Sequence, residues 1–171
     1  MKHAKTIKRL IAIFIPLCIC IVAYGVFRTR ESRDQAFRSD LIQIDSSLNV
    51  IEQYGKAYLD GSSSETGALI IRELSHISTA VDSIYLNQNG IPVDLRQKLY
   101  DYVDELNGTF SILEPAQTKL CIQNILEAVK SFHPLFDDIN SITTHTFAKE
   151  AKIFIDTLFS FSFPGKTADG S

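Results

Sequence analysis

The segment FRSDLIQIDSSLNVIEQYGKAY, residues 37–58, decides the fold, because its apolar residues recur at alternating intervals of four and three. Only Gly55 interrupts the series. Residues with this spacing lie along one face of an α-helix, where they form a seam that packs against neighbouring helices. The segment therefore predicts an amphipathic helix, whose seam consists of Phe37, Leu41, Ile44, Leu48, Ile51 and Tyr58.

Four later segments repeat this alternation, at residues 70–84, 95–106, 122–139 and 147–161. No segment shows a convincing period of two, which a half-buried β-strand would require. The sequence therefore predicts an all-α protein, with an N-terminal transmembrane helix followed by an antiparallel helical bundle of four to five helices. Turn-forming pairs separate the segments or follow them; they are Asp60-Gly61, Asn89-Gly90, Asn107-Gly108 and Pro164-Gly165.

Local signals place the ends of individual helices. Ser62 and Glu65 match the capping box S-x-x-E just ahead of the second segment. Pro115 suits the first turn of the helix that contains the fourth segment. Pro134 lies inside that segment, where its ring and its missing N–H predict a kink or a break near Phe132.

An apolar stretch near the N-terminus, Leu10 to Phe27, contains eighteen residues and no charge. A helix of this length can cross a hydrocarbon core of about 30 Å. Four basic residues precede it and three follow, so the positive-inside rule weakly favours a cytoplasmic N-terminus. The alternative is a cleaved, secreted protein, because Ala23-Tyr24-Gly25 resembles a signal-peptide cleavage site. Both interpretations place the remaining chain outside the cytoplasm.

Charge divides the chain in the same region. Residues 1–30 carry six Lys or Arg and no acid, whereas residues 31–171 carry eleven Lys or Arg against twenty Asp or Glu. An acidic body argues against nucleic acid as the main partner. We therefore predict a single-pass protein of the cell membrane, with a basic cytoplasmic N-terminus (1–9), a transmembrane anchor (10–27), an extracytoplasmic helical bundle (28–163) and a flexible tail (164–171).

Two histidines have acidic residues at helical spacing. Glu73 and His76 match the E-x-x-H step of di-iron carboxylate bundles, but those proteins carry two such pairs and this chain carries one. Both residues flank the predicted seam, so we interpret them as part of a solvated helix face. His133 and Asp137 are four residues apart and are expected to form an ordinary surface pair.

The sequence contains little else that points to chemistry. Cys121 is the only cysteine after residue 27, and we interpret it as a small buried hydrophobic residue, with an intermolecular disulfide as the alternative. Asn107-Gly108-Thr109 is a formal N-glycosylation sequon. The chain has no phosphate-binding glycine loop and no GxSxG, CxxC or HExxH motif. We therefore expect no enzyme activity, no metal and no cofactor.

Phenylalanines cluster near the end of the last segment. Successive residues of a helix are about 100° apart, so Phe159, Phe161 and Phe163 cannot all share one seam with Phe154 if the helix continues. At least one ring is then expected on the surface, where it would dock a protein partner, a second copy of the chain or the bilayer surface. The alternative is simple packing of these rings on the connector from Phe110 to Leu113. Phe159, Phe161 and Phe163 are therefore the candidate docking residues.

One family resemblance follows from these features. A short basic start, a single apolar anchor and an exported helical body resemble the N-terminal region of YpeB-type spore-germination membrane proteins. The residues that carry the likeness are Ala36-Phe37, Asp40-Leu41, Ile44-Asp45 and Leu99-Tyr100-Asp101-Tyr102. The resemblance covers the anchor and the helical region, and not the C-terminal domains of those proteins, so it transfers no functional residue.

Three classes of function are compatible with the sequence. A non-catalytic anchored bundle that holds or positions another envelope protein fits the anchor, the heptad spacing and the absence of catalytic motifs. A sensory or ligand-binding bundle is the second class, although such receptors usually carry a second membrane span. An enzyme would need a convergent pocket that no motif indicates.

Overall fold

The computed structural model describes residues 2–61, 66–88 and 91–163, and the side chains of residues 2–14, 17 and 66 lie outside this description. The described residues contain no strand, which confirms the all-α prediction. They form the α-helices α1 (Lys2–Leu59), α2 (Thr66–Asn87), α3 (Val93–Thr109), α4 (Pro115–Phe132) and α5 (Thr144–Leu158), and the 3₁₀ helices η1 (Phe110–Ile112) and η2 (His133–Ser141).

The chain divides into two units, residues 1–36 and residues 37–171. The first unit is helical, and its described side chains from Ile15 to Gln35 are exposed. Within the described residues, no helix combines the length and the apolar character needed to cross a membrane. The predicted anchor, Leu10 to Phe27, lies partly outside them, because the side chains of residues 10–14 and 17 are not described. The predicted tail, 164–171, lies wholly outside them.

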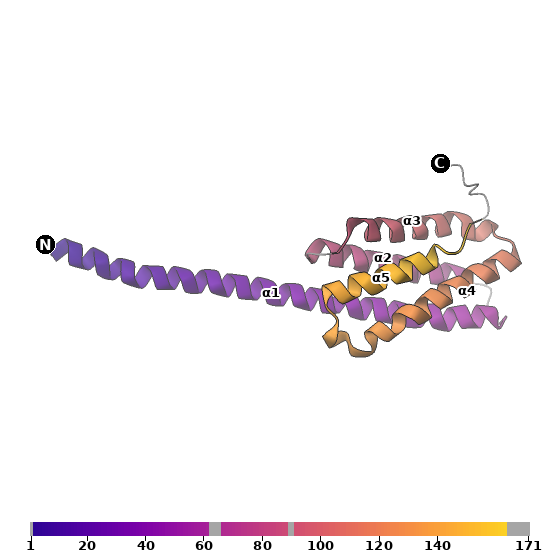
Figure 1. Ribbon diagram of the computed structural model, residues 1–171, viewed down its shortest axis with the longest axis horizontal. Helices are drawn as coiled ribbons and strands as arrows, with labels where there is room; N and C mark the ends of the chain where they lie inside the picture. The colour runs from indigo at the N-terminus through magenta and orange to yellow at the C-terminus, as the bar shows by residue number, and fades with distance from the viewer. Residues whose placement is uncertain (1, 62–65, 89–90, 164–171) are drawn as a thin grey trace. The chain divides into compact units, whose positions relative to one another are not determined.

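The second unit is a bundle of helices that pack side by side (Figure 1). Helix α2 packs along α3, α4 packs along α5, and α3 also contacts α5. Within this unit, α1 contributes the seam predicted from residues 37–58, and its large apolar side chains are buried. Phe37 is 8% exposed, and the fully buried members of the seam are Leu41, Ile44, Leu48 and Ile51.

Most of the predicted helix ends agree with the structure. Helix α1 ends at Leu59, and Gly61 follows with a φ of +76°, a conformation that glycine adopts at little steric cost. Asn107-Gly108 lies in the last turn of α3 instead of after it. Helix α4 ends at Phe132, so the break predicted from Pro134 is confirmed, and the chain continues as η2. The predicted capping pair, Ser62 with Glu65, lies outside the described residues.

A side chain of α4 caps the end of α5. The amide nitrogen of Asn124 donates to the carbonyl oxygens of Thr157 and Leu158, at 3.1 and 3.0 Å. Its amide oxygen accepts a hydrogen bond from the Ser160 hydroxyl at 2.8 Å. The last carbonyls of a helix have no partner within that helix, so Asn124 satisfies them from outside and fixes α5 against α4.

Two glycines allow close packing between elements. A Cβ atom on Gly55 would lie 2.8 Å from Leu126 Cδ2, so its absence lets α1 approach α4. A Cβ atom on Gly67 would lie 2.0 Å from Phe110 Cε1, so the Phe110 ring covers the first turn of α2 only because residue 67 has no side chain.

We expect Gly67→Ala to destabilise the protein by about 1–3 kcal/mol, because the added methyl group forces the Phe110 ring away from α2. Gly108→Ala is the matched control: it also lies in a helix, no atom would contact its Cβ within 4 Å, and it should stabilise by about 0.5–1 kcal/mol. Urea unfolding of both variants measures the difference. Equal midpoints would show that the contact between Gly67 and Phe110 does not constrain the fold.

Candidate functional site

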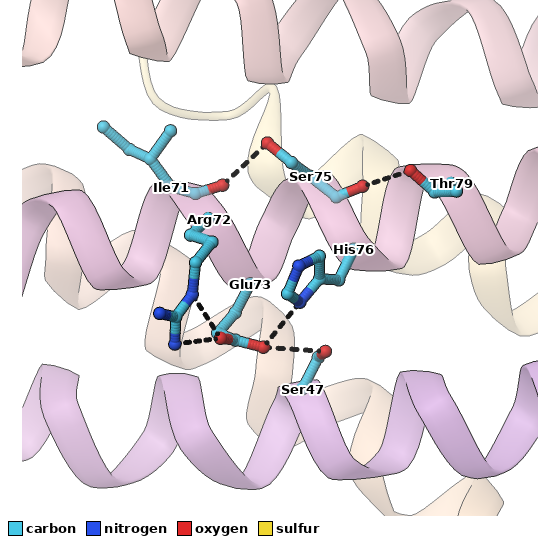
Figure 2. Close-up of polar contacts among 7 residues, drawn as sticks. All are labelled: Ser47, Ile71, Arg72, Glu73, Ser75, His76 and Thr79. Atoms are coloured by element: carbon cyan, nitrogen blue, oxygen red, sulfur yellow. Dashed lines mark hydrogen bonds and ion pairs between the residues drawn. The ribbon is translucent and has the colours of Figure 1, made fainter.

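A buried carboxylate links α2 to α1. Glu73 is 6% exposed and contacts donors on three sides (Figure 2). The Ser47 hydroxyl of α1 donates to Glu73 Oε2 at 3.0 Å. The Arg72 guanidinium donates to Oε1 from Nε at 3.0 Å and from Nη2 at 2.8 Å, and His76 Nδ1 lies 3.2 Å from Oε2.

These donors determine the charge of Glu73. Burial by itself raises the pKa of Glu73, but the hydrogen bonds from Arg72, Ser47 and His76 together lower it below its ordinary value. The carboxylate is therefore ionised at neutral pH. It is a charged group that the bundle retains at a helix interface because its donors replace water.

The prediction that Glu73 belongs to a solvated face is wrong, whereas His76 is exposed as predicted. Glu73 flanks the seam of α2, and a flanking position is covered when the opposite helix presents a small side chain, here Ser47. Among the described residues, no group of three or more His, Cys, Asp or Glu side chains is placed to hold a metal ion. Hydrogen-bond donors occupy both oxygens of Glu73 instead.

His133 contacts α1, and not Asp137 as the sequence predicted. Its Nε2 lies 3.2 Å from Asp45 Oδ1, and its Nδ1 lies 3.6 Å from Glu52 Oε2. The predicted pairing assumed α-helical winding after Phe132. Because η2 winds as a 3₁₀ helix with about three residues per turn, a residue four positions later does not share the face of His133.

Cys121 is fully buried on α4, which confirms its interpretation as a core residue. Burial raises the pKa of its thiol to about 12, and the nearby Tyr102 hydroxyl only partly opposes this rise. The thiolate is the reactive form of cysteine, so the thiol is unreactive in this environment. An intermolecular disulfide through Cys121 would require the core to open.

The predicted docking residues divide between surface and core. Phe159 is 41% exposed, so at least one ring lies on the surface as expected, whereas the candidate docking residues Phe161 and Phe163 are buried, at 9% and 6% exposed. Phe161 and Phe163 lie beyond the last helix, because α5 ends at Leu158. After Leu158, successive side chains no longer have to point about 100° apart, so these rings can turn toward the core. The centre of the Phe163 ring lies 5.7 Å from the centre of the Tyr102 ring. A docking role remains a prediction for Phe159.

A groove of about 680 Å³ runs between α2 and α3 on the surface of the bundle. Its lining residues fall at intervals of seven along both helices, so they form a second heptad stripe outside the core seam. On α2 they are Ala68, Ile71, Arg72, Ser75, Ser78, Thr79 and Asp82, and on α3 they are Arg96, Gln97, Tyr100, Val103, Asp104 and Asn107. Sequence reasoning missed this stripe because it looked for large apolar residues, and most of these are small or polar.

Polar contacts hold the groove walls in place. Arg96 Nε lies 2.7 Å from Asp82 Oδ1 across the two helices, and its guanidinium lies 5.3 Å from the centre of the Tyr85 ring. The hydroxyls of Ser75 and Thr79 donate to the carbonyl oxygens of Ile71 and Ser75, each at 2.9 Å (Figure 2). These small side chains are satisfied within α2 and leave room above them.

No family model matches the chain, and comparisons with curated proteins and with solved structures gave no significant match. The resemblance to YpeB-type proteins is therefore neither supported nor opposed by them.

We expect Glu73→Gln to destabilise the protein by about 1–3 kcal/mol at pH 7, because it removes the charge that Arg72 and Ser47 stabilise. Since the pKa of Glu73 is lowered by folding, this stabilisation is present above about pH 4.5 and is lost as the pH falls through the folded value. The variant should therefore lose less stability on acidification than the wild type. Denaturant unfolding at several pH values measures both effects.

Glu127→Gln on the exposed face of α4 is the control for this substitution, and it should change the free energy of unfolding by less than about 0.5 kcal/mol. Similar behaviour of the two variants would show that the contacts of Glu73 add nothing to those of a solvated carboxylate.

Proposed function

We propose that this chain is a non-catalytic, membrane-anchored protein whose extracytoplasmic helical bundle holds or positions a partner envelope protein. The apolar segment Leu10 to Phe27 and the basic residues before it support the anchor and its orientation. Large apolar side chains within that segment, among them Ile19, Val22 and Phe27, are exposed, and lipid would cover them.

The α2–α3 groove is the observation that carries the partner-binding role. A heptad stripe on two adjacent helices is the surface onto which a third helix packs, with side chains of the incoming helix inserted between those of the groove. Tyr100 is 62% exposed at this groove and offers an aromatic anchor, while Ala68 and Ser75 allow close approach. We infer that the partner supplies an amphipathic helix to this groove.

The chemistry of the groove favours binding over catalysis. Its arginines are paired with carboxylates, Arg72 with Glu73 and Arg96 with Asp82. The hydroxyls of Ser75 and Thr79 donate to backbone carbonyls, so neither is aligned with a general base as an activated nucleophile would be.

A sensory or ligand-binding bundle is the second candidate, because the groove volume of about 680 Å³ is within the range of small-molecule sites. The two functions differ in what fills the groove. A partner helix would cover the whole length of the groove, and a crosslinking experiment would join the partner to this chain as an adduct of larger mass. A small ligand would give no such protein adduct.

A photo-crosslinking side chain at position 79, in the full chain in membranes of the source organism, tests the proposal. We expect a discrete crosslinked protein from position 79 and none from Gln123, an exposed control position on α4. Tyr100→Ala should reduce the yield several-fold by removing the aromatic anchor, whereas Leu120→Ala, an exposed apolar residue away from the groove, should leave it unchanged.

Two results would contradict partner binding at this groove. One is the same adduct from positions 79 and 123, and the other is an equal loss of crosslinking yield in Tyr100→Ala and Leu120→Ala. An absence of adducts together with thermal stabilisation by a small molecule would favour the second candidate.

A further inference from the structure

The His133 side chain bridges η2 and α1 through both of its ring nitrogens. Nε2 faces Asp45 Oδ1 at 3.2 Å and Nδ1 faces Glu52 Oε2 at 3.6 Å. Asp45 and Glu52 are seven residues apart on α1, so their carboxylates project from the same face of that helix. The imidazole lies between them.

Only one protonation state of histidine suits this arrangement. The imidazolium carries an N–H on each nitrogen and a positive charge, so a proton faces each carboxylate. A neutral imidazole has one nitrogen with a lone pair, which would face a carboxylate oxygen and repel it. The contact is therefore complete only when His133 is protonated.

The charges around His133 lead to the same conclusion. Lys56 of α1 pairs with Glu52, and this contact, together with the charge of His133, lowers the pKa of Glu52. With both carboxylates ionised, Asp45, Glu52, Lys56 and His133 sum to zero only if His133 carries a proton. On the segments adjacent to His133, Lys130 and Asp137 are exposed to solvent.

We propose that His133, Asp45 and Glu52 form a pH-sensitive clasp that holds η2 against α1 while His133 is protonated and weakens when it is neutral. The three side chains are 29%, 31% and 37% exposed, so water and protons reach them without unfolding of the core. The clasp is independent of the function proposed for the α2–α3 groove, and it would make the η2 corner of the bundle respond to the pH of its surroundings.

Other contacts determine how far the corner opens. Phe132 and Phe136 pack edge to face with ring centres 5.1 Å apart, and Arg38 of α1 donates to Asn140 of η2. Neither contact titrates near neutral pH. The loss of the proton therefore loosens η2 locally and leaves the apolar core closed. The clasp stabilises the corner while His133 is protonated, so its contribution falls as the pH rises.

Amide hydrogen exchange of the full chain at pH 5.5 and pH 8, corrected for intrinsic exchange rates, tests the clasp. We expect the protection of the η2 amides to fall by roughly three- to tenfold at pH 8, the effect of losing partly exposed ion pairs. His133→Gln should abolish this change. His145→Gln, on an exposed face of α5, is the control and should retain it.

Asp45→Asn and Glu52→Gln test the same clasp without replacing the histidine, and each should reduce the pH-dependent change in η2 protection. The proposal is overturned if His133→Gln keeps the wild-type change. If His133→Gln does not fold, the two carboxylate variants decide. The proposal is then overturned if Asp45→Asn and Glu52→Gln both keep the pH-dependent change in η2 protection at its wild-type size.

Discussion

The buried seam of α1 is the surface on which the second unit of the chain depends. Four of its side chains, from Leu41 to Ile51, have no exposed area. Burial of such a side chain contributes about 1.5–3 kcal/mol to the stability of the fold. An isolated helix of ordinary length is only marginally stable in water, so the helix depends on this burial. The seam also determines where the flanking residues of α1 lie, and these residues form polar contacts on both of its sides.

The two carboxylates in the contact between α1 and α2 show how the number of donors decides the state of a buried acid. Asp40 receives one hydrogen bond, from the Ser83 hydroxyl at 2.8 Å, and desolvation raises its pKa above the ordinary value. Glu73 is more buried, yet its pKa is lowered because Arg72, Ser47 and His76 surround it. The same interface thus stabilises the charged form of one acid and disfavours that of the other.

Periodicity was sufficient to predict the helices, because the large apolar residues of each segment repeat at a spacing that only one structure buries on a single face. Pro134 and Gly61 marked ends for equally local reasons. The positions of Glu73 and His133 depend on what the opposite helix presents, Ser47 in one case and Asp45 with Glu52 in the other, and a single segment carries no such information. Phe161 and Phe163 were candidate docking residues but are buried, because the last helix ends at Leu158, three residues before the first of them. The groove was missed because its stripe consists of small and polar side chains.

Residues 37–58 of α1 belong to the same cooperative core as the other helices of the second unit. Amide hydrogen exchange of the full chain near neutral pH measures this directly. We expect the amides of residues 41–51 of α1 to be as well protected as those of residues 122–129 of α4, because both open only when the whole core unfolds. If the α1 amides exchanged with a much smaller free energy of opening while the α4 amides stayed protected, residues 37–58 would not belong to this core.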